Sequence, residues 1–314
     1  MTLLLLALVA TLPAPADSLR PTSPAHRLAL TFSNDIFFAL DYYFTQGIAL
    51  HWVSPGLARS PVNYLLPKGP AGSIRSHGMS LRYNLFTPLV IEDAVIRRGD
   101  RPYTTYGYVS LYRASNQAAR RQRLTTALEI GYLGPDAGGK ALQTKVHSLL
   151  HYSLPRGWQY QLRSAAVLGY RASFEKQVFA AGRSTELIGQ VEASLGTLYT
   201  YAQAGLRVRV GRFTPYFADV DPASLARRWH CYGEATFTDR LVGYDATLQG
   251  GVLAHDNPYV LPARAVRRAV LHGSGGLVVT HGGLSLTATA ALVAPEFAGG
   301  RWHPWGVLGV GQVF

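Results

Sequence analysis

Cysteine is almost absent from this chain of 314 residues, and Cys231 alone cannot support a disulfide scaffold. Charged residues are scarce, at 15% against roughly 25% in an ordinary soluble domain. Beyond residue 20 no apolar run approaches the ~20 residues that a membrane-spanning helix needs, which excludes a helical membrane protein. Yet 48% of the residues are hydrophobic, which excludes disorder. A β-rich globule or a membrane β-barrel remains.

The charge balance favours anionic partners, because 30 Lys and Arg against 18 Asp and Glu give a net charge of +12. The positive charge is scattered in short clusters such as Arg120-Arg121, and no zinc-finger, helix-turn-helix or RRM pattern accompanies it. We therefore expect no nucleic-acid partner. Solvated loops, or loops that meet phosphate headgroups, explain the clusters.

The N-terminus reads as a secretory signal peptide over residues 1–16. Residues 3–12 are LLLLALVATL, followed by PAPADS with cleavage expected near Ala14 or Ala16. No Lys or Arg precedes the apolar run, which departs from the usual pattern. Residues 17–314 are expected to form a single domain.

The rest of the chain alternates with a period of two, as β-strands do. In 284–292 Leu284, Leu286 and Leu292 alternate with Ser285 and Thr287. Residues 44–53 repeat the pattern, with Ile48, Leu50 and Trp52 opposite Thr45, Gly47, Ala49 and His51. A soluble sandwich would bury the apolar face, whereas a transmembrane barrel turns it toward lipid.

Three features favour the barrel. The candidate strands are about 10 to 15 residues long, where ~9–11 tilted residues span a bilayer. The chain ends inside a strand on Phe314, a final aromatic that resembles the C-terminal signature of bacterial outer-membrane barrels. Aromatic residues near segment ends are interpreted as interfacial girdles. These are Tyr103, Tyr106, Tyr108, Tyr112, Trp158, Tyr160, Trp302 and Trp305.

The sequence thus predicts an all-β protein, a twelve-stranded antiparallel transmembrane β-barrel with a short helix in one loop. An even strand number places both ends of a closed barrel on one side. The predicted strands are 26–34, 44–54, 74–87, 103–115, 122–133, 158–175, 184–197, 198–211, 230–249, 266–280, 281–294 and 303–314. The helix is expected at 140–151, where Gln143, Val146, His147 and Leu150 recur at helical spacing.

Polar residues near strand ends are the candidates for chemistry. Asn34 and Asp35 end the first strand, and a carboxylate with an amide can bind a hard cation such as Ca²⁺, although Asn-Asp is also a common turn. Gln143 and His147 share one helical face, and histidine is the natural general base near neutral pH, although a loop-helix histidine can be purely structural.

Two other constellations are weaker. His147 and His151 have a spacing that can chelate zinc, but HSLLH lacks the Glu of zincins and no third ligand is evident. Ser148 would point about 100° away from His147 on a helix, which disfavours a nucleophile–base pair.

An ordered set of motifs resembles the outer-membrane lipid A deacylases that remove the acyl chain at the 3′ position. The set is ND at 34–35, DYYFTQG at 41–47, FTP at 86–88, GDRPY at 99–103, GPDAGG at 134–139, Q-x-x-x-H at 143–147, PRGWQYQL at 155–162 and DATLQG at 245–250. Each motif alone is weak, whereas their order and spacing over the mature chain are specific.

The resemblance implies a Ca²⁺-dependent ester hydrolysis of lipid A in lipopolysaccharide, at the bacterial outer membrane, by a protein expected to be a monomer. His147 would be the general base that activates water, and Asp35 would hold part of a Ca²⁺ that stabilises the oxyanion. Asn34, Thr45 and Gln143 match the family positions that orient metal, water or substrate.

This sequence departs from the family at two charged positions. The family lysine between the third and fourth strands falls near Ile91-Glu92, and the acid six residues after the histidine is Ser153. Glu92, Arg97 or Arg98 are candidates to replace the missing charges. Two alternatives therefore stay open: a non-enzymatic porin or structural barrel, and a phospholipid acyl hydrolase of the same family.

Overall fold

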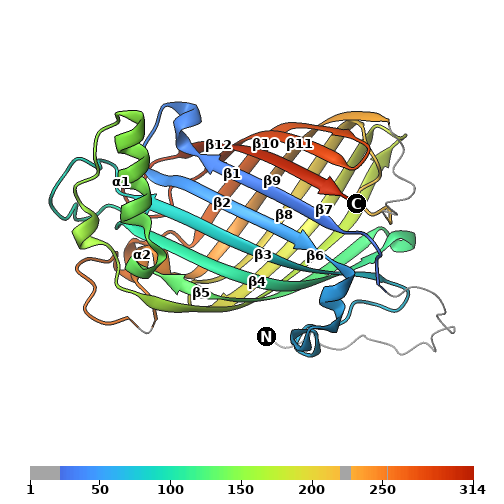
Figure 1. Cartoon of the computed structure of the whole chain (residues 1–314), viewed down its shortest axis with the longest axis horizontal. Coiled ribbons are helices and arrows are strands. Elements are labelled where there is room, and N and C mark those ends of the chain that lie inside the picture. Colours follow the sequence, from blue (N-terminus) through green and yellow to red (C-terminus); the bar gives the residue numbers. More distant parts are fainter. Residues whose placement is uncertain (1–21, 220–227, 253) are drawn as a thin grey trace, which may run out of the picture.

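The computed structural model describes residues 22–219, 228–252 and 254–314, so the predicted signal peptide lies outside the described residues. The strands close into one antiparallel barrel in which each strand pairs with its sequence neighbours and β1 pairs with β12 (Figure 1). The strands are β1 (Arg27–Asn34), β2 (Tyr43–Val53), β3 (Ile74–Thr87), β4 (Thr104–Gln117), β5 (Gln122–Leu133), β6 (Ala165–Ala181), β7 (Thr185–Gly196), β8 (Tyr199–Arg212), β9 (Trp229–Asp245), β10 (Ala269–His281), β11 (Leu284–Val293) and β12 (His303–Val313).

The predicted twelve-stranded architecture is confirmed, and the predicted helix is α1 (Gly139–Leu150). Two strand predictions were wrong at one end. The segment predicted from residue 158 starts as a 3-10 helix, η6 (Trp158–Tyr160), and β6 begins only at Ala165. The segment predicted to residue 249 leaves the sheet at Asp245, whose side chain caps the short helix α2 (Ala246–Gln249) by accepting the Thr247 N–H at 2.8 Å.

The barrel is closed by β1, which pairs with β12 along its whole length. The β1–β12 register runs from Arg27 opposite Val313 to Asn34 opposite Gly306. A closed barrel leaves no unpaired strand edge, which is the condition for crossing hydrocarbon. No helix within the described ranges is long and apolar enough to cross a membrane. We call the end where β1 begins and β12 ends the terminal end, and the opposite end the site end.

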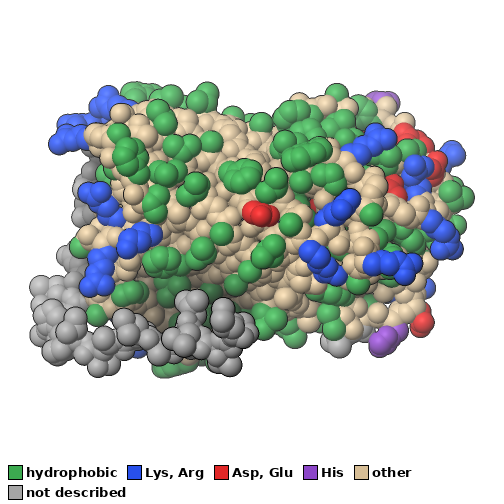
Figure 2. All heavy atoms as spheres, turned by 180° about the vertical axis from the view of Figure 1, so that it is seen from behind, with side chains coloured by type: hydrophobic (Ala, Val, Ile, Leu, Met, Phe, Trp, Pro, Cys, Tyr) green, Lys and Arg blue, Asp and Glu red, His purple; other side chains and the backbone are tan. Residues whose placement is uncertain are grey.

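The barrel is apolar outside and polar inside. Outward side chains in the middle of the strands stay exposed, and Figure 2 shows hydrophobic side chains across the middle of one face with Lys and Arg toward both ends. They include Leu28, Leu30, Phe32, Leu50, Leu81, Ile130, Leu168, Val191, Leu206, Phe237, Leu277, Leu286 and Leu308. This is the surface of a barrel that sits in lipid.

Three predicted girdle tyrosines of β4, Tyr106, Tyr108 and Tyr112, face the lumen and not the membrane, and Tyr112 lines a cavity there. Tyr106 and Tyr108 are buried in a cluster with Phe86 and Leu133, and Tyr106 accepts a hydrogen bond from Asn84 at 2.6 Å. Their rings fill the lumen because strand alternation turns these positions inward. Tyr103 and Trp158 are also buried, in a third cluster.

Side chains also line the lumen at mid-height and at the site end. Arg171 bonds Glu129 at 3.0 Å and Glu192 at 3.4 Å, and Tyr201 donates to Glu192 at 2.6 Å. Nearer the site end the buried Arg101 donates to Glu296 at 2.6 Å. Polar and charged side chains therefore line the interior at mid-height, along β5 to β8, and an ion pair lies nearer the site end.

Candidate functional site

Helix α1 packs on the outer wall of the barrel and not over its lumen. Along β3, Leu81 points outward and is 45% exposed, whereas Leu85, four residues later on the same face, is 0% exposed. Leu85 is covered by Tyr103 and Trp158, which belong to the segments flanking α1 and β4. Figure 1 shows α1 lying across the site end in front of β2 and β3.

A glycine allows this close approach. A Cβ built on Gly139 would lie 1.7 Å from Oγ1 of Thr105 and 3.0 Å from the ring of Trp158. Thr105 pairs with Leu85 across the β3–β4 ladder, so it is on the same outer face. The first turn of α1 can therefore rest on β4 only because position 139 has no side chain.

The end of α1 fixes the ring of His147. His151 adopts the left-handed conformation (φ 57°) and ends the helix, after which the chain turns back. The carbonyl oxygen of Ser153 thereby lies 2.6 Å from Nδ1 of His147. A carbonyl only accepts, so Nδ1 carries the proton and Nε2 of the neutral ring keeps its lone pair. The buried His147 is thus prepared to act as a base through Nε2.

Asp41 faces this basic nitrogen, and the sequence reasoning did not single it out as a site residue. Its Oδ2 lies 3.5 Å from Nε2 of His147, and its Oδ1 lies 3.5 Å from Nε2 of Gln143. Burial raises the pKa of Asp41 to about 6, the His147 charge lowers it, and Glu92 raises it. The carboxylate could have been suspected from its place in the DYYFTQG motif.

Trp158 fixes the orientation of Gln143. The indole N–H of Trp158 donates to Oε1 of Gln143 at 2.8 Å. Because an indole N–H only donates, the Gln143 oxygen must face Trp158 and its amide NH₂ must face Asp41. Trp158, Gln143, Asp41 and His147 therefore form one connected chain of contacts.

Asn34 and Asp35 lie at the start of the same loop as Asp41. The Asn34 side chain accepts the Ile36 N–H at 2.8 Å and so caps the 3-10 helix η1 (Asp35–Phe38). The Asp35 carboxylate is 1% exposed and accepts the Tyr42 N–H at 2.9 Å. Burial raises the pKa of Asp35 to about 9, the Tyr42 hydrogen bond lowers it, and the Asp41 charge raises it. Both predicted residues thus shape the loop that presents Asp41.

Thr45 does not follow the predicted alternation. A bulge between Phe44 and Gln46 interrupts the β2–β3 register. The Thr45 hydroxyl contacts the Thr87 hydroxyl at 3.0 Å, and Thr87 lies on the same face of β3 as Leu85. Thr45 therefore does not share the lumen face with His51, since a bulge resets which face a residue occupies.

The donor set around Asp35 fits a hard cation. In the described part of the chain no basic group forms an ion pair with this buried carboxylate, and an unpaired buried charge is costly. The described residues contain no cluster of three His, Cys, Asp or Glu side chains. A bound Ca²⁺ would therefore take most of its ligands from carbonyl, hydroxyl and water oxygens, which it accepts.

Neither weaker constellation gains support. Ser148 and His151 are both exposed, whereas His147 is buried. The proposed charge replacement by Arg97 is also not favoured, because this guanidinium is held by Asp93 and by Asp100 at 3.3 Å. Glu92 is exposed and adds negative charge near Asp41. The Arg156 N–H donates to the Ile91 carbonyl at 2.8 Å, so a basic residue from the segment after α1 does lie beside the position of the family lysine.

Apolar side chains surround the candidate site on the outer surface. Ile36, Phe37 and Phe38 of η1 are 40%, 48% and 42% exposed. The Phe37 ring covers Gly306, an outward position of β12. It also packs edge-to-face against the ring of Phe32, with 6.3 Å between the ring centres. Beyond the C-terminal turn of α1, Tyr152 and Leu154 are half exposed, and in the helix itself Leu150 is half exposed and Leu149 is 75% exposed. The site thus opens on the lipid-facing side.

Comparison with known proteins agrees with this architecture. The sequence model of the family described as outer membrane protein LpxR matches residues 3–314. Among solved structures, LpxR from Salmonella typhimurium has 17% identity and a TM-score of 0.73, over 92% of this chain and 100% of that chain. The β domain of the Bordetella autotransporter Brka has 13% identity and a TM-score of 0.46, over 93% and 99% of the two chains. No curated protein sequence matches. This chain therefore belongs to the LpxR family and is an outer-membrane β-barrel.

Proposed function

We propose that this protein is a Ca²⁺-dependent esterase that removes an acyl chain from lipid A, with His147 as the general base. One observation carries the proposal. The buried His147 and the partly exposed Asp41 form a pair on the outer wall of the barrel, beside exposed apolar side chains, where a membrane lipid can reach it. A pair in the lumen would instead meet only soluble molecules.

The imidazole can supply both proton transfers of ester hydrolysis. Water attacks the ester carbonyl while Nε2 of His147 takes its proton, and the resulting imidazolium returns a proton to the departing alkoxide. The Ser153 carbonyl holds Nδ1–H throughout. The Asp41 carboxylate, 3.5 Å from Nε2, stabilises the imidazolium while it exists. This places Asp41 partly in the role of the missing family acid.

The remaining residues position these groups. Gln143 directs its NH₂ toward Asp41, Asn34 fixes the start of η1, and Thr45 occupies the bulge of β2 beside Thr87. Asp35 would hold Ca²⁺, with further oxygen ligands from the same loop. When bound, Ca²⁺ would polarise the ester carbonyl and stabilise the oxyanion as a Lewis acid.

The orientation of the barrel supports a substrate in the outer leaflet. The segments between strands are longer at the site end, where residues 88–103, 134–164 and 246–268 lie, than at most turns of the terminal end. Outer-membrane barrels carry their longer loops outside and their shorter turns toward the periplasm. The site would then lie at the level of the outer leaflet, where lipopolysaccharide is found.

The porin alternative meets an obstacle in the packed lumen. The hydroxyls of Tyr106 on β4 and Tyr199 on β8 lie 3.5 Å apart across the interior, within a buried cluster, whereas a porin needs a continuous water-filled channel. A phospholipid acyl hydrolase would use the same chemistry on the ester of a different lipid. An assay with both substrates distinguishes it from a lipid A deacylase.

The direct test uses the purified protein in detergent with two substrates, lipid A and a glycerophospholipid. We expect Ca²⁺-dependent release of fatty acid from lipid A, abolished by chelator and by His147→Ala. Release of fatty acid from the phospholipid alone would show that the phospholipid, and not lipid A, is the substrate. No release from either, by a barrel that is folded and supplied with Ca²⁺, would overturn the proposal.

A further inference from the structure

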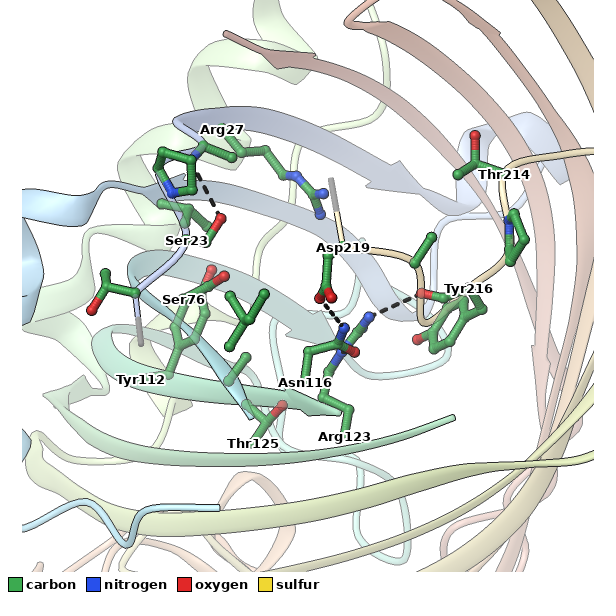
Figure 3. A pocket seen from close by; sticks show the side chains of 18 of the residues that line it. Ser23, Arg27, Ser76, Tyr112, Asn116, Arg123, Thr125, Thr214, Tyr216 and Asp219 are labelled. Atoms are coloured by element: carbon green, nitrogen blue, oxygen red, sulfur yellow. Dashed lines mark hydrogen bonds between the residues drawn. The ribbon is translucent and has the colours of Figure 1, made fainter. Parts of the chain in front are cut away.

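A cavity of about 570 Å³, drawn in Figure 3, lies inside the lumen at the terminal end, and none of its lining residues belongs to the candidate esterase site. Its walls are inward-facing residues of β1–β5, β8 and β9, together with the segment 213–219 that follows β8. The buried cluster around Tyr106 of β4, whose hydroxyl lies 3.5 Å from that of Tyr199 on β8, occupies the lumen toward the site end. The cavity is therefore a separate pocket that a membrane lipid cannot enter from the side.

The segment that forms one wall of the cavity is firmly held. The Tyr216 N–H donates to Glu186 at 3.2 Å, and its hydroxyl donates to Glu175 at 2.7 Å. Arg123 donates to the Tyr216 carbonyl at 3.0 Å, and its guanidinium lies 4.8 Å from the centre of the Tyr216 ring. These contacts fix the wall before any ligand arrives, which lowers the entropic cost of binding.

Arg123 and Arg209, which line the cavity with Arg27, are compensated by glutamates, as is the neighbouring Arg207. Arg207 lies 3.2 Å from Glu175, and Arg123 lies 3.7 Å from the same carboxylate. Arg209 is paired with Glu186. Positive charge at these positions is therefore already balanced within the barrel wall.

Arg27 is the exception. It projects from β1 into the cavity (Figure 3), and within the described ranges its side chain makes no ion pair or hydrogen bond. The one carboxylate that lines the cavity, Asp219, accepts a hydrogen bond from Asn116 at 2.8 Å and makes no ion pair with Arg27. A guanidinium offers five donors in a planar fork that matches an oxyanion.

We propose that this cavity binds a small soluble oxyanion, a phosphate or carboxylate group, on the Arg27 guanidinium. Among the described arginines that line the cavity, Arg27 is the one without a carboxylate partner, and hydroxyl groups around it supply further donors. These hydroxyls belong to Ser23, Ser76, Tyr112, Thr125 and Thr214. The volume lies in the range of small-molecule sites, about 300–1,000 Å³.

Titration calorimetry of the full barrel in lipid-free detergent tests the proposal, with inorganic phosphate as the probe. Ionic strength is held constant up to about 50 mM phosphate, because added salt screens the guanidinium. We expect saturable binding that Arg27→Ala weakens at least about tenfold, which corresponds to about 1.4 kcal/mol. Arg27→Lys keeps the positive charge but loses the planar set of guanidinium donors, so its phosphate affinity should lie between those of the wild type and Arg27→Ala. Asp219→Asn removes the nearby negative charge and should bind more tightly.

Arg59→Ala is the matched control, because Arg59 ends η2 (Pro55–Arg59) at the same end of the molecule and does not line the cavity. It should bind phosphate as the wild type does. Absence of saturable binding by the wild type, or equal binding by Arg27→Ala and Arg59→Ala, would overturn the proposal. Arg27→Lys and Asp219→Asn keep the test decisive if Arg27→Ala does not fold.

Discussion

Oδ2 of Asp41 lies 3.5 Å from Nε2 of His147, although the two residues are far apart in the chain. Asp41 belongs to the loop between β1 and β2, and His147 belongs to α1 between β5 and β6. They meet because α1 lies against the outer wall over β3 and β4, which brings it next to the first loop. The barrel thus serves as a rigid frame on which an acid and a base from two loops are paired.

Asp41→Asn should lower kcat at least about tenfold with little change in KM, because the imidazolium loses its counter-charge, and a factor of ten is about 1.4 kcal/mol. Initial rates of lipid A hydrolysis over a range of substrate concentrations separate kcat from KM. Asp136→Asn, which removes an exposed carboxylate just before α1, should leave kcat unchanged. An Asp41→Asn enzyme with the wild-type kcat would remove Asp41 from the chemistry.

Trp158→Phe should reduce kcat through Gln143. The substitution removes the indole N–H that fixes the Gln143 amide, so the NH₂ no longer faces Asp41 in every molecule. Kinetics of Trp158→Phe, Gln143→Ala and the double variant form a cycle, and we expect strongly non-additive losses. Trp302→Phe, an exposed tryptophan at the same end, is the control. Additive losses would show that Trp158 supports the fold alone.

Gly139→Ala should displace α1 from the barrel wall. Its Cβ would lie 1.7 Å from the Thr105 hydroxyl, so the helix must move away and carry His147 with it. We expect a large loss of activity from a barrel that still shows heat-modifiable migration in gels. Gly273→Ala, where nothing lies within 4 Å of the added carbon, should retain full activity. Wild-type activity in Gly139→Ala would contradict the tight helix–wall contact.

Calcium affinity should rise with pH between about 7 and 9. Burial raises the pKa of Asp35 to about 9, so at neutral pH the metal-free carboxyl holds a proton that Ca²⁺ must displace. The sign follows directly, because raising the pH removes this competing proton. Calorimetry in buffers of different ionisation enthalpy should show about one proton released per Ca²⁺ bound near pH 7. Binding that is independent of pH, or unchanged in Asp35→Ala, would remove Asp35 from the metal site.

Much of the fold follows from the sequence. Period-two alternation locates the strands because lipid selects one face of each strand and the lumen the other, as Leu284, Leu286 and Ser285 illustrate. The helical spacing of Gln143 and His147 likewise predicts α1, and both are buried on one face. Alternation alone cannot reveal the bulge at Thr45, because a bulge depends on pairing with the neighbouring strand.

The site was harder to predict than the fold. Helix α1 covers the outer wall through contacts between residues that are distant in the sequence, such as Gly139 against Thr105. No local sequence pattern indicates such contacts. Tyr103 and Trp158 were therefore interpreted as girdle residues although they form the floor beneath α1. Asp41 was missed as a partner of His147 because the two approach only in the closed barrel.

In the proposed function, His147 activates the water that cleaves an acyl ester of lipid A at the outer wall of the barrel. Mass spectrometry of lipid A from cells that produce the wild type or His147→Ala tests this role. We predict lipid A lighter by one acyl chain with the wild type, and unmodified lipid A with a His147→Ala barrel that reaches the outer membrane in equal amount. Lipid A that is identical in the two strains would contradict the claim.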